Sequence, residues 1–155
     1  MEESVVPKAN EVSFVGFLKK EFDLADMDIK TYSPLTLAYI GDAIYDVIIR
    51  TILVEKGNAP VNKLHKSASS LVKASAQVQM FRAMEPVLTE QELSVYKRGR
   101  NAKSYTSAKN ASITDYRIAT GLEALVGYLY LTDNMPRIVE LIKMGLKSIQ
   151  GNRKG

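Results

Sequence analysis

Residues 39–48 place two acidic side chains, Asp42 and Asp46, in an otherwise apolar, helix-forming run. The two acids are four residues apart, so on a helix they lie on one face and repel each other. Burying a carboxylate among aliphatic residues costs free energy unless a positive charge or a hydrogen-bond donor meets it. A divalent cation would relieve both penalties, because hard cations prefer carboxylate oxygens. An ordinary ion pair between Asp46 and Arg50, again four residues apart, is the alternative for the second acid.

The chain around this run shows the apolar spacing of helices, with no internal repeat and no alternating strand pattern longer than a few residues. Ser33-Pro34 has the signature of an N-cap followed by proline at the first helical position. The helix that begins there should end near Gly57, and its apolar character nearly all round predicts a central, buried position. Further helices are expected over residues 13–22, 60–84 with a break near residue 74, 89–99, 115–131 and from 136 onward. The sequence therefore predicts an all-α helical bundle.

Length and composition limit the organisation and the chemistry. The 155 residues suit one domain over residues 13–150, with a flexible N-terminus over 1–12 and a flexible tail over 151–155. There is no cysteine, which excludes disulfides, thiolate nucleophiles and Cys-ligated zinc, and one histidine, His65, cannot support a multi-histidine metal site. Nucleotide-binding glycine motifs are absent from the sequence. No signal core or membrane-spanning segment is found, so we expect a cytoplasmic protein without a membrane partner.

Positive charge is concentrated in residues 93–114, which contain no acidic residue and five cations, more than the whole formal net charge of +4. Cationic side chains neutralise phosphates, while Asn, Ser and backbone N–H groups hydrogen-bond phosphate or sugar oxygens. The segment therefore favours a polyanionic partner, although a solvated charged loop is the simpler alternative. The candidate nucleic-acid-binding residues are Lys97, Arg98, Arg100, Asn101, Lys103 and Lys109.

A second helix repeats the design of the first, because Glu123 lies mid-helix between Gly121 and Gly127. Glycine inside a helix costs roughly 1 kcal/mol relative to alanine, so these glycines indicate close packing or a site. If the two helices cross near Gly41 and Gly121, Asp42 and Glu123 can share one Mg²⁺. A hydrogen bond between Glu123 and a neighbouring helix is the alternative.

Three stretches resemble motifs of the ribonuclease III family, and they occur in that family's order. Residues 37–43 are similar to the helix that ends in Leu-Gly-Asp-Ala, and residues 123–127 are similar to the second acidic motif, Glu-Ala-Leu-Ile-Gly. Residues 98–104 and 116–125 resemble the Mini-III branch of the family. The likeness extends from about residue 32 to residue 131, which is most of the chain.

The resemblance implies an all-helical, homodimeric endonuclease domain without a separate double-stranded-RNA-binding domain. It implies Mg²⁺-dependent hydrolysis of phosphodiesters in double-stranded RNA, leaving 5′ phosphates. Asp42 and Glu123 are then the catalytic, metal-binding acids, and the basic residues named above hold the duplex. The Mini-III branch further implies maturation of the 5′ and 3′ ends of precursor 23S ribosomal RNA, with a large-subunit ribosomal protein as a candidate partner.

Three positions depart from the general family pattern. Ordinary ribonuclease III members carry acids where this chain has Leu35 and Ala38, and an aspartate where it has Thr120. The Mini-III branch shares this reduced pattern. Asp46 lies one turn beyond Asp42 on the same helix face, so we expect it to replace part of the lost carboxylates as a third acid of the metal site. It would act through a water molecule or through contact with a group that binds the metal.

Two other functions remain open at this point. A non-catalytic module that binds duplex RNA or assists ribosome assembly could keep the same fold and the same basic segment. A helical metal-carboxylate oxidase is the weaker alternative, because such proteins use Glu-x-x-His motifs and this chain has one histidine.

Overall fold

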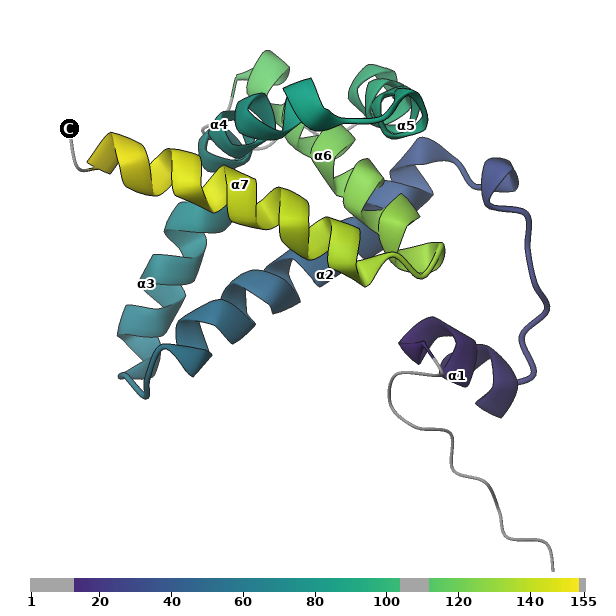
Figure 1. Cartoon of the computed structure of the whole chain (residues 1–155), viewed down its shortest axis with the longest axis horizontal. Coiled ribbons are helices and arrows are strands. Elements are labelled where there is room, and N and C mark those ends of the chain that lie inside the picture. Colours follow the sequence, from purple (N-terminus) through teal and green to yellow (C-terminus); the bar gives the residue numbers. More distant parts are fainter. Residues whose placement is uncertain (1–12, 104–111, 154–155) are drawn as a thin grey trace, which may run out of the picture.

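The computed structural model describes residues 13–103 and 112–153, and these are helical with no strand (Figure 1). The predicted all-α fold is confirmed. The predicted N-terminus of residues 1–12 lies outside the described residues, whereas the last helix continues to residue 153, into the predicted tail. The helices are α1 (Phe14–Glu21), α2 (Pro34–Glu55), α3 (Val61–Val72), α4 (Ala74–Met84), α5 (Glu90–Asn101), α6 (Ile113–Leu131) and α7 (Met135–Arg153), with short 3₁₀ turns at Ile29–Thr31 and Glu85–Val87.

Helix boundaries follow local capping chemistry. The Ser33 hydroxyl accepts a hydrogen bond from the Thr36 backbone N–H at 3.1 Å, and Pro34 occupies the first turn of α2, as predicted. Thr89 and Glu92 form a reciprocal capping box at the start of α5. The break between α3 and α4 falls at Lys73, which adopts an extended conformation close to the predicted position.

Helices α2 and α6 cross at the centre of the molecule, and α4 and α7 pack beside them (Figure 1). The core lies among these four helices and includes Tyr45, Phe81, Leu125 and Ile142. None of the helices in the described ranges is both long enough and apolar enough to cross a bilayer.

The prediction that α2 is buried all round is wrong for its outer face. Leu37, Tyr45 and Ile49 are buried against the core, but Tyr39 is 82% exposed and Val47 is 58% exposed. Packing partners cover one side of α2 only, so its apolar residues on the other side face outward. An exposed apolar strip of this kind is typical of an interaction surface.

Glycines allow the close approach of α2 and α6. A Cβ at position 41 would overlap the backbone carbonyl of Glu123, and a Cβ at position 127 would overlap the backbone carbonyl of Leu37. Gly127, rather than the predicted Gly121, is therefore the glycine that faces Gly41. Gly121 instead lies against the Tyr96 ring of α5. The backbone contact at Gly41 places Glu123 beside the residue that follows Gly41, Asp42.

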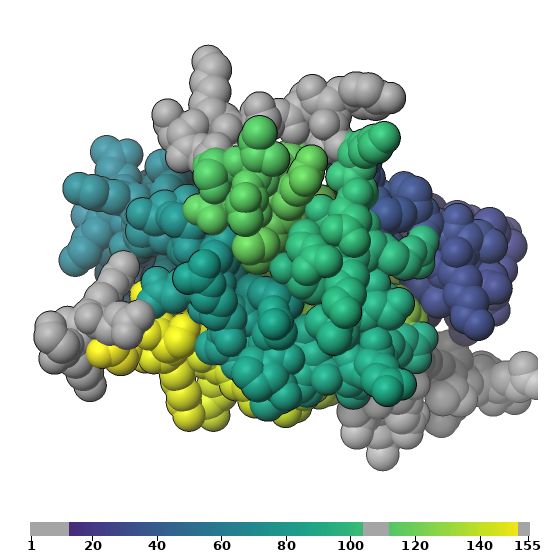
Figure 2. Space-filling model, turned by 90° about the horizontal axis from the view of Figure 1, so that it is seen from above, coloured from purple at the N-terminus to yellow at the C-terminus, as the bar shows by residue number. Residues whose placement is uncertain are grey.

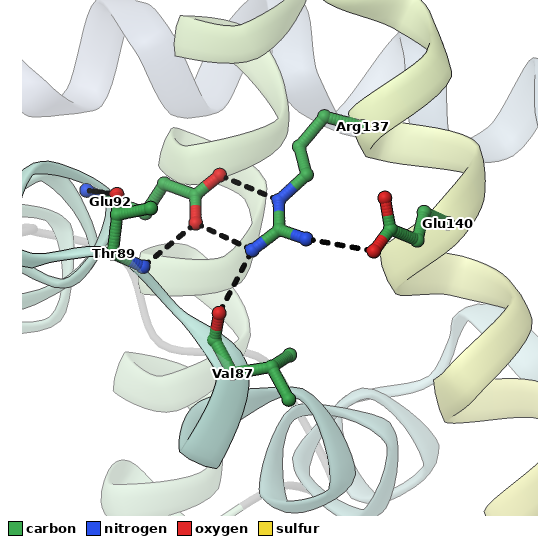
Figure 3. A network of polar contacts seen from close by, with 5 residues as sticks. All are labelled: Val87, Thr89, Glu92, Arg137 and Glu140. Atoms are coloured by element: carbon green, nitrogen blue, oxygen red, sulfur yellow. Dashed lines mark hydrogen bonds and ion pairs between the residues drawn. The ribbon is translucent and has the colours of Figure 1, made fainter.

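A buried ion pair connects the start of α7 to the start of α5 (Figure 3). Arg137 donates from Nε to Glu92 Oε2 at 2.9 Å and from Nη2 to Glu92 Oε1 at 2.8 Å. It also donates to the Val87 carbonyl at 2.9 Å and to Glu140 Oε1 at 3.0 Å. Because Glu92 also completes the cap with Thr89, one carboxylate fixes both the start of α5 and its attachment to α7.

Candidate active site

An open groove with a volume of about 670 Å³ is lined by residues of α2, α3 and α6. Asp42, Asp46 and Glu123 all line it, together with Arg50 and His65. His65, the one histidine of the sequence, is exposed at the groove. The structure thus brings all three predicted acids to one concave surface.

Asp42 and Glu123 form the polar centre of this groove. Asp42 is exposed and Glu123 is half-buried, and their carboxyl groups interact through a hydrogen bond. Burial is the main cause that raises the pKa of Glu123 to about 9, and the hydrogen bond and negative charge of Asp42 raise it further. The side-chain amide of Gln77, on α4, acts in the opposite direction. Two carboxyl groups this close cannot both ionise without a compensating positive charge.

The nearby hydroxyl of Tyr45 is already engaged. It donates toward the Leu71 carbonyl at 2.7 Å and toward Met80 Sδ at 3.0 Å. Burial first, and the charge of Glu123 second, raise the pKa of Tyr45 far above its ordinary value. Tyr45 therefore stays protonated; it is fully buried and is not among the residues that line the groove.

The donor set fits a hard divalent cation. The carboxyl groups of Asp42 and Glu123 converge on one groove. Burial and the neighbouring Asp42 both oppose the ionisation of Glu123. A bound cation would stabilise both side chains as carboxylates. Among the described residues, however, no cluster of three or more His, Cys, Asp or Glu side chains is close enough to hold a metal ion. A cation here would take two protein carboxylates and complete its coordination with water or substrate oxygens.

Asp46 shares the groove but makes a separate interaction. Its Oδ2 atom lies 3.0 Å from Arg50 Nε, so the ion pair considered as the alternative is present. Asp46 does not join Asp42 and Glu123 in a three-acid cluster within the described part of the chain. Its role as a metal-binding acid stays a prediction.

The three positions that carry acids in ordinary family members all border the groove. Leu35, Ala38 and Thr120 are among its lining residues, and the Thr120 hydroxyl donates to the Tyr116 carbonyl at 2.9 Å. The groove therefore carries no charged side chain at these three positions. The geometry agrees with a site that has few carboxylates.

The predicted nucleic-acid-binding residues lie at the end of α5, outside the lining of the groove. Lys97, Arg98, Asn101 and Lys103 are exposed. Arg100 is half-buried: its guanidinium lies 5.6 Å from the centre of the Tyr96 ring, and its Nε donates to Asn101 Oδ1 at 3.2 Å. Lys109 lies outside the described residues.

The end of α5 is nevertheless close to the groove. Gly99 packs against Gly121 and Ala124 of α6, and Thr120 on that same stretch of α6 lines the groove. Figure 2 shows α5 beside the first turns of α6 on one face of the molecule. The end of α5 and the groove therefore lie against the same stretch of α6.

Gln77 is the residue at this site that sequence reasoning missed. It lies in an apolar stretch of α4 and is buried, and it acts on the Glu123 carboxyl from a helix that carries none of the acidic motifs. A glutamine among apolar residues was the available signal, but the sequence did not show that Gln77 rather than Gln79 is buried, or which group it faces.

Comparison with known proteins identifies the family. The sequence profile of the family described as Ribonuclease III domain matches residues 35–134. This range is more than half of the chain and includes all the acids of the groove. The chain belongs to the ribonuclease III family. This family has endoribonuclease activity, so the groove is the candidate active site of an endoribonuclease.

Curated relatives place the chain in the Mini-ribonuclease 3 branch of the family. It is 51% identical over 129 residues to Mini-ribonuclease 3 of Clostridium tetani, which covers 83% of this chain and 84% of that protein. It is 50% identical over 124 residues to Mini-ribonuclease 3 of Enterococcus faecalis, covering 79% of this chain and 94% of that protein. A crystal structure of a Fusobacterium nucleatum protein superposes with a TM-score of 0.70 at 29% identity, covering 79% of this chain and 99% of that one.

Proposed function

We propose that this protein is a Mg²⁺-dependent endonuclease that cuts double-stranded RNA and matures the 5′ and 3′ ends of precursor 23S ribosomal RNA. The observation that carries the proposal is the pair of facing carboxyl groups, Asp42 and Glu123, in an open groove of a ribonuclease III chain. Enzymes of this family act on double-stranded RNA and use a divalent metal ion. A ribosomal RNA precursor as substrate also implies a cytoplasmic location.

Asp42 and Glu123 would hold the cation. A divalent cation, when bound, supplies a Lewis acid beside the scissile phosphate and favours ionisation of an attacking water. The two side chains have complementary tasks: exposed Asp42 is accessible from the groove, and half-buried Glu123 fixes the position through the α2–α6 crossing. The products are a 5′ phosphate and a 3′ hydroxyl.

The exposed end of α5 would hold the duplex by its backbone. A-form RNA presents phosphates and 2′-hydroxyls along a shallow minor groove, so recognition by shape outweighs recognition of base identity. Lys97, Arg98 and Lys103 supply charge for the phosphates, whereas Asn101 and Arg100 can hydrogen-bond phosphate or sugar oxygens. The position of these residues beside α6 supports this assignment.

A homodimer would give each protomer one strand to cut. Cleavage of both strands of a duplex by identical sites requires a two-fold arrangement of two copies. The exposed apolar side chains of α2 that do not line the groove, Val47 and Val54, support association through an apolar surface. Sedimentation equilibrium on the purified protein measures the oligomeric state, and a monomer at micromolar concentration would exclude the dimer.

The experiment that tests the function is cleavage of a duplex that carries the two paired ends of precursor 23S ribosomal RNA. We expect cutting with Mg²⁺ and none with a chelator, and we expect Asp42→Asn to bind the duplex but not to cut it. Retained turnover by Asp42→Asn would refute the assignment of the site. Binding without any metal-dependent cutting by the wild-type protein would instead identify a non-catalytic RNA-binding module. Adding large-subunit ribosomal proteins shows whether one of them presents the substrate.

A further inference from the structure

Gln77 is the polar exception on the buried side of α4. Its neighbours Val78, Met80 and Phe81 are apolar core residues, and Gln77 itself is only 2% exposed. Its amide nitrogen, Nε2, completes no hydrogen bond within the described part of the chain. An unsatisfied buried donor destabilises the folded chain, so an apolar side chain would suit the core better. Packing alone does not account for a glutamine at this position.

The Gln77 side chain lies toward the Glu123 carboxyl, because α4 packs against α6. Two side chains therefore lie beside that carboxyl, Asp42 from α2 and Gln77 from α4. Tyr45 is also near Glu123. Its hydroxyl, however, donates toward the Leu71 carbonyl and Met80 Sδ. Gln77 thus places an amide donor beside Glu123, and this donor has no other partner in the described part of the chain.

We propose that Gln77 is a positioning residue: its side-chain amide donates to one Glu123 carboxylate oxygen and orients the other toward Asp42 and a shared divalent cation. The inference rests on the proposed function, since it takes Glu123 as a cation-binding group. It also gives the buried, unpartnered Nε2 an acceptor, namely one oxygen of the Glu123 carboxylate. A hydrogen bond behind a metal-binding carboxylate restricts its orientation and strengthens metal binding.

Binding of Mn²⁺ or Mg²⁺ alone to the purified full chain, measured by isothermal titration calorimetry, tests the proposal. Gln77→Met keeps the length of the side chain and removes the amide, so we expect a loss of about ten-fold or more in metal affinity, as for other partners of metal-binding groups. Thermal stability should be unchanged or higher, because an unsatisfied amide has been removed from the core. Gln79→Met, two residues further along α4 and only half-buried, is the matched control and should bind metal like wild type.

Wild-type metal affinity in Gln77→Met would overturn the proposal. In a Glu123→Gln background, Gln77→Met should cause no further loss of metal affinity. An additional loss of similar size would also overturn the proposal, because Gln77 would then act by a route other than Glu123. If Glu123→Gln alone binds metal like wild type, the proposed function of Glu123 fails, and this result is distinct from a failure of Gln77.

A measurement on the unaltered chain covers the case in which Gln77→Met does not fold. In protein labelled with ¹⁵N-glutamine, the side-chain amide resonance of Gln77 should move when Mg²⁺ is added to the wild type. The same resonance should not move in Glu123→Gln. A Gln77 resonance that ignores Mg²⁺ in the wild type would overturn the proposal.

Discussion

The charge of Glu123 should make the protein less stable as pH rises when a chelator removes divalent cations. The pKa of Glu123 is about 9 in the folded chain, whereas its ordinary value is 4.5. Between these values the folded chain keeps a proton that the unfolded chain has released. Stability from this group is therefore fully present below the unfolded pKa and is lost progressively as pH rises through the folded pKa.

The slope can be worked out from this shift. Between the two pKa values the folded chain binds one proton more than the unfolded chain. The free energy of unfolding therefore falls by about 1.4 kcal/mol for each unit that the pH rises in this range. Between about pH 6 and about pH 8 this amounts to about 3 kcal/mol, or roughly 6 to 12 °C in melting temperature for a chain of this size. Glu123→Gln removes the titrating group at constant shape, so it should melt above the wild type by a margin that grows with pH.

Thermal melts of both proteins across this range, at one protein concentration and with chelator, provide the assay. Asp42→Asn is the informative second variant. Burial is the largest cause of the raised pKa of Glu123, and the Asp42 carboxylate that this variant removes is the next. Its margin over the wild type should also grow with pH, less steeply than that of Glu123→Gln. Melting curves of wild type and Glu123→Gln that run parallel with pH would refute the assignment of a protonated Glu123.

Three further perturbations test other parts of the structure. Gly41→Ala would force α2 away from the Glu123 carbonyl, so we expect a loss of about 3 kcal/mol in denaturant unfolding and no cleavage, whereas Gly151→Ala, whose Cβ meets open space, should behave like wild type. Arg137→Ala should lower the unfolding free energy by about 3 to 5 kcal/mol, because it leaves the Glu92 carboxylate buried without its partner; a loss below 1 kcal/mol would contradict the role of this ion pair. Measuring the Mg²⁺ dependence of cleavage in Asp46→Asn and in wild type separates metal binding by Asp46 from its ion pair with Arg50. An unchanged Mg²⁺ midpoint would exclude metal binding and leave the ion pair as the role of Asp46.

Local chemistry made most of the helices predictable from sequence. The N-cap at Ser33 and the capping box of Thr89 with Glu92 depend on residues within one helical turn, so sequence neighbours determine them. Gly41 and Gly127 could not be paired in advance, since a glycine only shows that some element approaches closely. Which helix approaches, and at which residue, depends on the packing of the whole bundle.

The exposed side of α2 shows the same limit for burial. Apolar residues all round a helix indicate contact on every side, and they do not distinguish contact within one chain from contact with a second molecule. Tyr39 and Val47 belong to the outer side, and no short-range pattern separates them from Tyr45, which is fully buried. The proposed homodimer would remove this ambiguity, because a partner would cover the outer side.

Asp42 was identifiable from sequence because an acid in an apolar helix is conspicuous, but its environment was not. The structure adds that Glu123 is held at the α2–α6 crossing, where burial opposes its ionisation and only the Gln77 amide among its hydrogen-bonding groups favours it. A group that lowers stability when charged would be replaced by a neutral one if folding alone mattered. Glutamine is the same size as glutamate, so steric requirements do not explain the acid. The loss of folding stability measured in the melts with chelator is therefore the free energy that cation binding must supply. This loss should shrink when saturating Mg²⁺ is restored.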